Sequence, residues 1–266
     1  MIKLLVAGAC GKMGAQILSL AAKDSAFKIT GAFESKGHAR VGKPLSEILG
    51  IEGLNTAVTA GIESVVKAGD VVIDFTHRDA TPEHVRVCQA AGLAMVIGTT
   101  GLSEETLQTI KQASQKIAIV QSPNMSAGVN LLFKLTELVA AKLSDEYDIE
   151  IVEAHHRHKK DAPSGTALEL ARSAARGRKV DLSQKGVYGR EGLTGERPRG
   201  EIGVHAVRGG DVVGDHTVSF MAEGERVELT HKASSREAFA KGALLAAKFV
   251  TGKKTGLYTM HDVLGL

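Results

Sequence analysis

The sequence has few cysteines, no long apolar run and no block of like charge, and each of these absences excludes a class of protein. Only Cys10 and Cys88 occur among 266 residues, which excludes a disulfide framework and indicates ordinary thiols in a reducing compartment. No apolar stretch approaches the roughly 20 residues of a membrane-spanning helix. The net charge of +3 is small and the basic residues are spread along the chain, so neither a membrane nor nucleic acid is an expected partner.

The N-terminal residues also lack the pattern of an export signal. The apolar run at 2–7 leads directly into a glycine-rich loop, with neither the length nor the cleavage pattern that export requires. No internal repeat interrupts the chain, and its 43% of hydrophobic residues can form one large or two medium cores. We therefore expect a cytoplasmic protein that acts on a small anionic substrate.

A glycine-rich turn follows the first apolar run. Gly8, Gly11 and Gly14 stand between this strand candidate and a helix expected over 15–22, in the spacing G-x-x-G-x-x-G. Such a turn brings the pyrophosphate of a dinucleotide against the start of a helix. Glycines that serve only the packing of the helix are the alternative interpretation.

An acidic residue stands where a dinucleotide site needs one. The strand expected over 27–33 ends at Glu34, about twenty residues after the last glycine, and this carboxylate can accept the hydroxyls of the adenine ribose. Ser35 and Lys36 follow, and Lys36 with Lys12 would weaken discrimination against a phosphorylated ribose. The expected cofactor is NADH, and NADPH stays open as a second one.

Strands and helices then alternate, which predicts an α/β domain with a doubly wound parallel sheet of the Rossmann type. The strand candidates are 71–75, 94–97 and 117–120, and the helix candidates are 82–91 and 103–116. Ligands of such sheets bind at the carboxyl ends of the strands, so the loops 98–100 and 122–125 are expected at the nicotinamide end of the cofactor. Turns without a ligand are the alternative for each loop.

After residue 126 the pattern changes to that of an α+β domain. Its expected helices are 129–143 and 163–176, its expected strands are 148–154, 202–207, 212–221 and 226–232, and a glycine-rich, charged loop spans 186–200. Strands joined by such short turns form a mixed, largely open sheet. One chain leaves that sheet partly uncovered, which favours a homo-oligomer.

The end of the chain is expected to return to the first domain, through a last helix at 235–251 and the segment 256–264. The predicted dinucleotide-binding domain is therefore 1–126, completed by 236–266. The predicted substrate-binding and oligomerisation domain is 127–235.

The most informative segment is the run from Glu153 to Ala167, which places three histidines and two lysines beside a helix start. Histidine exchanges protons near neutral pH, and a nearby lysine neutralises a carboxylate. Pro163 suits the first turn of a helix, and residues 164–166 offer hydroxyls and N–H groups to an anion. A solvated loop is the alternative, and a metal is disfavoured because the neighbouring cationic side chains would repel it.

These motifs resemble those of the 4-hydroxy-tetrahydrodipicolinate reductase family, also called dihydrodipicolinate reductase, over nearly the whole chain. The resemblance rests on the glycine loop 8–14, on Ile73–Thr76, on Val96–Gly101, on the histidine run, and on Arg190–Arg197 and His231–Arg236. The histidine run is highly specific, whereas the glycine loop alone is not.

The resemblance implies NAD(P)H-dependent reduction of 4-hydroxy-tetrahydrodipicolinate to tetrahydrodipicolinate, with loss of water, in lysine and diaminopimelate biosynthesis. It implies that His155 donates a proton and that Lys159 is a second acid/base and substrate-binding residue. His156, Gly165 and Thr166 match positions that bind the substrate carboxylates. The implied cofactor contacts are Gly8, Ala9, Cys10, Gly11, Lys12, Met13, Glu34, Gly98, Thr99, Thr100, Ser122, Pro123, Asn124 and Met125.

One departure from the family and two other functions stay open. A family arginine just after the acidic residue can meet the ribose phosphate of NADPH, but Ser35 stands there in this chain. The family is typically a homotetramer assembled through the sheets of the second domain, so we expect the same assembly. The alternative functions are another two-domain NAD(P) oxidoreductase acting on an amino or hydroxy acid, and a non-catalytic protein that senses NAD(H).

Overall fold

The computed structural model of the protein describes all 266 residues, and the chain divides into two compact units. Unit 1 consists of Met1–Ala127 and Arg236–Leu266, and unit 2 consists of Gly128–Ser235. None of the helices is both long enough and apolar enough to cross a membrane.

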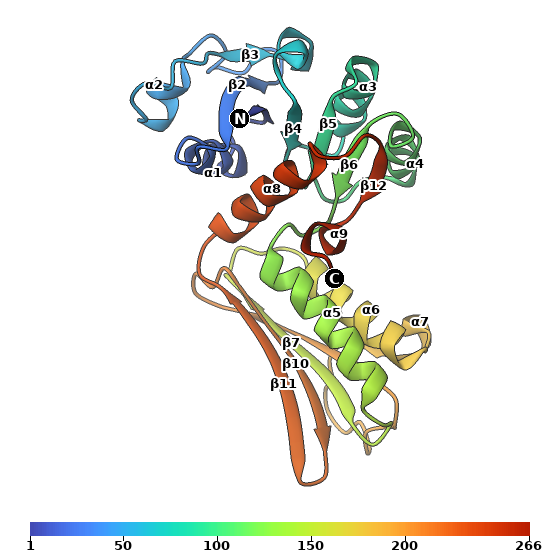
Figure 1. Ribbon diagram of the computed structural model, residues 1–266. Helices are drawn as coiled ribbons and strands as arrows, with labels where there is room; N and C mark the ends of the chain where they lie inside the picture. The colour runs from blue at the N-terminus through green and yellow to red at the C-terminus, as the bar shows by residue number, and fades with distance from the viewer. The chain divides into compact units, whose positions relative to one another are not determined.

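Unit 1 is built on a seven-stranded sheet (Figure 1). Its strands are β1 (Ile2–Ala7), β2 (Phe27–Glu34), β3 (Val58–Ala60), β4 (Val71–Asp74), β5 (Ala94–Ile97), β6 (Ala118–Gln121) and β12 (Gly256–Tyr258). They lie in the order β12-β6-β5-β4-β1-β2-β3, and every neighbouring pair is parallel. The predicted parallel sheet is confirmed.

Helices cover both faces of this sheet. α1 (Lys12–Ala21) and α8 (Glu237–Val250) pack on one face, and α3 (Thr81–Ala91) and α4 (Glu104–Ala113) pack on the other. Leu4 and Val6 of β1 belong to the core on the side of α1 and α8, whereas Leu5 and Ala7 belong to the opposite core. Burial on both faces explains why the strands are continuous apolar runs, and the doubly wound fold is confirmed.

The sequence pattern does not predict several short elements of unit 1. These are α2 (Leu45–Leu49), β3, two 3₁₀ turns (Ile62–Ser64 and Val66–Ala68), β12 and α9 (Met260–Leu264). β12 pairs with β6 at the edge of the sheet, where Leu257 lies opposite Ile119. Three residues are too few to show a period, so the pairing alone makes this segment a strand.

Unit 2 contains a mixed five-stranded sheet. Its strands are β7 (Asp148–His155), β8 (Gly186–Val187), β9 (Ile202–Arg208), β10 (Gly214–Ala222) and β11 (Glu225–Ala233), in the order β11-β10-β7-β9-β8. β9 is parallel to β7 and β8, whereas β10 is antiparallel to β7 and β11. Figure 1 shows α5 (Ala127–Lys142) and α6 (Gly165–Arg178) on one face of this sheet, followed by the short α7 (Leu182–Lys185).

Within unit 2 the other face of the sheet has no helix over it. Side chains alternate along β7, so that Ile149 and Ile151 are buried in the core while Val152 is 42% exposed. β11 is exposed over most of its length. The predicted mixed and largely open sheet is confirmed.

Two arginines hold the glycine-rich stretch 186–200 to the sheet. Arg190 donates to both carboxylate oxygens of Glu150 on β7, at 3.1 and 2.9 Å, and Arg197 Nε donates to Glu150 Oε1 at 2.8 Å. Burial raises the pKa of Glu150, but hydrogen bonds from Arg190, Arg197 and His205 outweigh it and lower the pKa to about 2. Apart from β8 the stretch has no regular structure, and this ion cluster fixes its path.

The helix after the histidine run begins later than predicted. Pro163 was expected in its first turn, but Pro163 lies in the preceding turn and Ser164 is the N-cap of α6, with φ −65° and ψ 154°. The Ser164 hydroxyl accepts a hydrogen bond from Ala167 N–H at 3.2 Å. Such a cap contributes about 1 kcal/mol, and it fixes the start of α6 one residue after Ser164.

α8 packs so closely on the loop after β6 that only glycine fits at position 242. A Cβ at Gly242 would lie 1.7 Å from the carbonyl oxygen of Met125. Alanine normally stabilises a helix by about 1 kcal/mol relative to glycine, but here it has to displace backbone. We expect Gly242→Ala to lower the free energy of unfolding by about 1 to 3 kcal/mol, measured by urea denaturation.

Gly252→Ala is the matched control for this measurement. A Cβ at Gly252 would meet its nearest atom, the carbonyl oxygen of Phe249, at 3.5 Å, which is ordinary contact. We expect this variant to keep the urea midpoint of the unmodified protein. Equal midpoints for the two variants would contradict the close packing of α8.

Candidate active site

The predicted cofactor residues of unit 1 lie along one edge of the parallel sheet. The glycine loop follows β1, Glu34 ends β2, Gly98–Thr100 follow β5 and Ser122–Met125 follow β6. All four segments are therefore at the carboxyl ends of strands, where ligands of such sheets bind. The structure brings together residues that are widely separated in the sequence.

The glycine loop lets the first helix approach the first strand closely. Gly8 has φ +63°, in the left-handed region that favours glycine. A Cβ at Gly14 would lie 2.1 Å from the carbonyl oxygen of Gly8, so no other residue fits there. Gly11 is the N-cap of α1 and offers no side chain to cap it. The N–H groups of the first helical turn can therefore donate hydrogen bonds to a phosphate.

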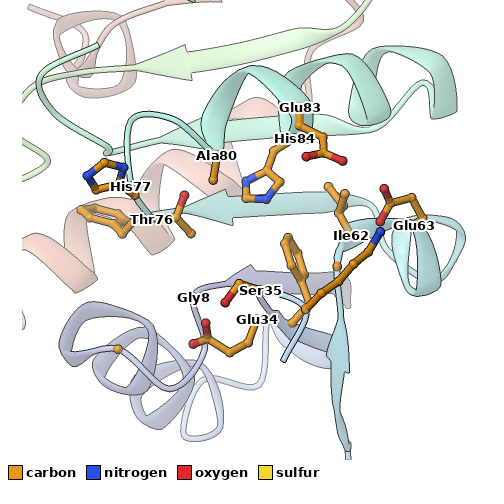
Figure 2. A pocket seen from close by; sticks show the side chains of 15 residues that line it. Gly8, Glu34, Ser35, Ile62, Glu63, Thr76, His77, Ala80, Glu83 and His84 are labelled. Carbon is orange, nitrogen blue, oxygen red and sulfur yellow. The ribbon is translucent and has the colours of Figure 1, made fainter. Parts of the chain in front are cut away.

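A cavity of about 510 Å³ opens beside this loop. Figure 2 shows Glu34 and Ser35 on one side of it and Ala80 and His84 on the other. Glu34 Oε1 accepts a hydrogen bond from Cys10 N–H at 2.8 Å, which orients the carboxylate beside the loop. Lys36 also lines this cavity, so both a carboxylate and a lysine side chain belong to its wall.

A buried carboxylate, Asp74 at the end of β4, organises the loops on either side of it. It accepts hydrogen bonds from Thr76 Oγ1 at 2.6 Å and from Thr99 Oγ1 at 3.2 Å, and it lies 2.9 Å from His84 Nδ1. Burial raises the pKa of Asp74, but its contacts with His84 and Thr76 outweigh burial and lower the pKa. The Thr99 hydroxyl is therefore engaged by Asp74. Sequence analysis assigned no role to Asp74 or His84.

The loop after β6 is fixed by its own hydrogen bonds. Ser122 Oγ donates to the carbonyl oxygen of Asn124 at 2.8 Å, and Asn124 Oδ1 accepts from Ser126 N–H at 2.9 Å. Met125 is 1% exposed and belongs to the core of unit 1. The Met125 side chain therefore packs in the core, and only the backbone of Met125 is left to contact a ligand.

In unit 2, His155 ends β7 and its ring is held by a buried glutamate. Residues i and i+2 of a strand point to the same face, and His155 Nδ1 lies 2.6 Å from Glu153 Oε2. Glu153 is fully buried. Its two oxygens also accept from the Arg208 guanidinium, at 2.7 and 2.8 Å, and from Ser164 N–H at 2.9 Å. Both carboxylate oxygens therefore accept hydrogen bonds, and the carboxylate holds the imidazole ring in a fixed orientation.

This arrangement decides which nitrogen of His155 can exchange a proton with a ligand. Burial raises the pKa of Glu153, but hydrogen bonds from Arg208, His155 and Ser164 outweigh burial and lower the pKa. Glu153 is therefore an ionised acceptor, and His155 Nδ1 carries the hydrogen between them. Nε2 is then the nitrogen left for a ligand.

A second buried histidine, His216 on β10, packs against the first. The ring centroids of His155 and His216 are 5.2 Å apart at an interplanar angle of 76°, and Ser164 Oγ lies 3.2 Å from His216 Nε2. Burial, and then the nearby His155, lower the pKa of His216 to about 4. His216 is therefore neutral at pH 7 and places no competing charge beside His155.

The other predicted residues lie around the start of α6. Lys159 Nζ donates to Asp161 Oδ1 at 2.9 Å, and His156 has a buried Nδ1 without a hydrogen-bond partner. Gly165 is the first residue of α6, Thr166 follows it, and a Cβ at Gly165 would meet nothing within 4 Å. A cation, an imidazole nitrogen without a partner and a helix start with space above Gly165 thus lie within eleven residues of His155 in the sequence.

Sequence analysis missed part of this site. Glu153 could have been found from the sequence, because it lies two residues before His155 and both side chains therefore point to one face of a strand. Arg208 could not have been found in this way, since 55 residues separate it from Glu153 and only the pairing of β9 with β7 brings the two together. His216 likewise meets Ser164 across 52 residues, through the pairing of β10 with β7.

Family models match both halves of the chain. Residues 2–125 match the model described as dihydrodipicolinate reductase, N-terminus, and residues 128–264 match that of its C-terminus. Curated proteins named 4-hydroxy-tetrahydrodipicolinate reductase from Desulfotalea psychrophila and from Anaeromyxobacter sp. (strain Fw109-5) are 48% and 49% identical over 266 residues. These matches cover all of this chain and 99% and 98% of the relatives.

Solved structures agree with this match. A dipicolinate-bound dihydrodipicolinate reductase from Paenisporosarcina sp. TG-14 is 29% identical with a TM-score of 0.79, over 98% of this chain and 99% of that one. An amine dehydrogenase from Mycobacterium smegmatis, 12% identical with a TM-score of 0.59 over 97% and 95% of the two chains, shares the fold alone. The resemblance inferred from the sequence motifs is confirmed.

The buried state of His216 predicts a specific loss of stability in acid. Its pKa of about 4 in the folded protein lies below its ordinary value of 6.5, so between these values the unfolded chain binds the extra proton. The free energy of unfolding therefore falls as the pH falls, by about 2 kcal/mol from this group between pH 7 and pH 5. We expect the urea midpoint to drop less over this interval in His216→Gln than in the unmodified protein.

His77→Gln is the control for this comparison, because His77 is an exposed histidine with 72% of its side chain accessible. Its midpoint is expected to drop as far as that of the unmodified protein. Equal drops in both variants would show that His216 is not held neutral by burial.

Proposed function

The chain belongs to the dihydrodipicolinate reductase family, and we propose that it reduces 4-hydroxy-tetrahydrodipicolinate to tetrahydrodipicolinate with NAD(P)H and loss of water. The observation that carries this proposal is the match of both family halves along the whole chain. The reaction belongs to lysine and diaminopimelate biosynthesis. We place it in the cytoplasm, which the free thiols of Cys10 and Cys88 support.

The cofactor is assigned to unit 1, whose strand ends fit a dinucleotide. The uncapped start of α1 at Gly11 offers N–H groups to the pyrophosphate, and the Glu34 carboxylate offers acceptors to the ribose hydroxyls. We assign the loops 98–100 and 122–125 to the nicotinamide end. Since Thr99 Oγ1 is engaged by Asp74, the backbone of residue 99 has to make that contact.

We propose NADH as the donor and NADPH as a second one. Glu34 favours the free hydroxyls of the NADH ribose and repels a phosphate at the same place. Lys36 lines the same cavity and supplies the positive charge that a ribose phosphate needs, although Ser35 takes the place of the family arginine. When bound, the reduced nicotinamide supplies the hydride.

Proton delivery is assigned to His155 in unit 2. Reduction of a conjugated imine leaves an electron-rich species, and a positioned acid stabilises it. Because Glu153 holds Nδ1–H, the proton that leaves His155 is the one on Nε2. Glu153 and Arg208 act as positioning residues, and the neutral His216 keeps a second positive charge away from the ring.

The substrate carboxylates are assigned to the helix start and the lysine beside it. Gly165 and Thr166 lie at the positive end of α6, and His156 adds a buried ring nitrogen without a partner. Lys159 has to release Asp161 to bind a substrate carboxylate. That exchange costs little, because the Asp161 side chain is 61% exposed and such pairs contribute about 1 kcal/mol or less.

We propose that the protein is a homotetramer assembled through unit 2. The uncovered face of the five-stranded sheet carries exposed apolar side chains, Val152 of β7 at 42% exposure and Val207 of β9 at 51%. Apolar side chains on an uncovered sheet favour a second copy as the cover. A single-chain mass by light scattering would contradict this assembly.

The proposed reaction predicts that the protein oxidises NADH when supplied with the freshly made condensation product of pyruvate and aspartate semialdehyde. His155→Ala and Lys159→Ala should lower kcat about 100-fold or more, since they remove the proton donor and the carboxylate-binding cation. The dissociation constant of NADH, measured by fluorescence titration, should stay near that of the unmodified enzyme. The same assay with NADPH gives the cofactor preference.

His158→Ala and Lys160→Ala are the matched controls, because both residues belong to the same run and are exposed. They should keep kcat within about twofold. Full activity of His155→Ala would overturn its role as proton donor. Absence of substrate-dependent NADH oxidation by the unmodified protein would overturn the proposed reaction.

A further inference from the structure

Three side chains of metal-binding type meet beside the glycine loop. They are Cys10 of the loop, Glu34 at the end of β2 and His38 in the turn that follows. The thiol sulfur, a carboxylate oxygen and an imidazole nitrogen all lie within 4.8 Å of one another. All three residues are partly exposed, so that an ion in solution can reach them.

We propose that Cys10, Glu34 and His38 form a binding site for a borderline-soft divalent cation, with Zn²⁺ as the best match and water as its fourth ligand. Thiolate, imidazole and carboxylate are the three ligand types of tetrahedral zinc sites. A hard cation such as Mg²⁺ takes oxygen ligands and gains nothing from the thiol. This site is separate from the histidine run of unit 2, in which the sequence disfavoured a metal.

Backbone contacts hold the three ligand residues in place. Cys10 N–H donates to Glu34 Oε1 at 2.8 Å, which fixes the carboxylate against the loop. His38 N–H donates to the carbonyl oxygen of Ser35 at 3.1 Å, which closes the turn after β2. The ligands therefore come from two short segments that are already joined, and little chain ordering is needed to bind an ion.

The local charges are compatible with a bound cation. Binding of the ion releases the proton of the Cys10 thiol, because the thiolate is the ligand. One thiolate and one carboxylate then neutralise Zn²⁺. Two features work against binding: the positive charge of Arg40 lies near Cys10, and His38 Nδ1 already accepts a long, 3.3 Å hydrogen bond from Arg40 N–H. These features limit the affinity without removing a ligand.

The proposed metal site and the proposed cofactor site share Glu34. This carboxylate lines the cavity of unit 1 that is assigned to the adenine ribose. Cys10 N–H already occupies Glu34 Oε1, so an ion on the other oxygen takes the acceptor that the ribose hydroxyls need, and the ion and the dinucleotide compete. This consequence rests on the proposed function, whereas binding of the ion itself does not.

Cobalt(II) provides the direct test, because it occupies zinc sites and has visible absorption. Titration of the reduced protein with Co²⁺ should give a near-ultraviolet thiolate-to-metal charge-transfer band and the visible bands of tetrahedral cobalt. Zn²⁺ should remove both. Cys10→Ser should abolish the charge-transfer band, and His38→Gln should weaken Zn²⁺ binding about tenfold or more in calorimetry.

Cys88→Ser and His77→Gln are the matched controls. Cys88 is the other thiol and is buried among apolar residues of unit 1, and His77 is an exposed histidine beside the same cavity. Both variants should keep the cobalt spectrum and the affinity for Zn²⁺. A spectrum without a charge-transfer band, or one that persists in Cys10→Ser, would overturn the site.

Competition with NADH tests the shared carboxylate. The apparent dissociation constant of Zn²⁺ should rise in proportion to the NADH concentration, and an unchanged constant with NADH bound would overturn the overlap. If NADH does not bind even without metal, the proposed function fails, while the cobalt spectrum still decides on the metal site.

Discussion

The buried carboxylate of Glu153 is the interaction on which the proposed proton-donor site of unit 2 depends. It joins three elements, because its donors come from the end of β7, from Arg208 on β9 and from Ser164 at the start of α6. A buried charge that loses one partner costs about 3 to 5 kcal/mol, so the set is held together as a unit. The same contacts orient His155 so that one defined nitrogen, Nε2, is left for a ligand.

The two units place their chemistry at strand ends by different means. In unit 1 the approach of a ligand depends on the absence of side chains, since Gly8, Gly11 and Gly14 bring the backbone of a helix start to the sheet edge. In unit 2 it depends on side chains, since Glu153 holds the His155 ring through a hydrogen bond. Asp74 is the counterpart of Glu153 in unit 1, because it also ends a strand and accepts from the residues around it, but its contacts shape loops and do not present an acid.

The fold was predictable from the sequence where a segment carried its own period. Continuous apolar strands such as β1 and the alternating strand β7 indicated both sheets, whereas the roles that the histidine run suggests for His155 and Lys159 stay predictions. β12 was not predictable, because three residues become a strand only by pairing with β6. Arg208 and His216 were not predictable either, since strand pairing across more than 50 residues brings them to Glu153 and Ser164. The start of α6 was misplaced because the side chain of Ser164 caps the helix after the proline that was expected in its first turn.

The central claim is that Glu153 holds the hydrogen of His155 on Nδ1 and leaves Nε2 for the substrate. Nitrogen-15 NMR of the imidazole rings, with His155 assigned by its loss in a His155→Gln variant, measures this directly. The account predicts that neutral His155 is the Nδ1–H tautomer and that Glu153→Gln removes this preference. A neutral His155 protonated on Nε2, or a tautomer that Glu153→Gln leaves unchanged, would contradict it.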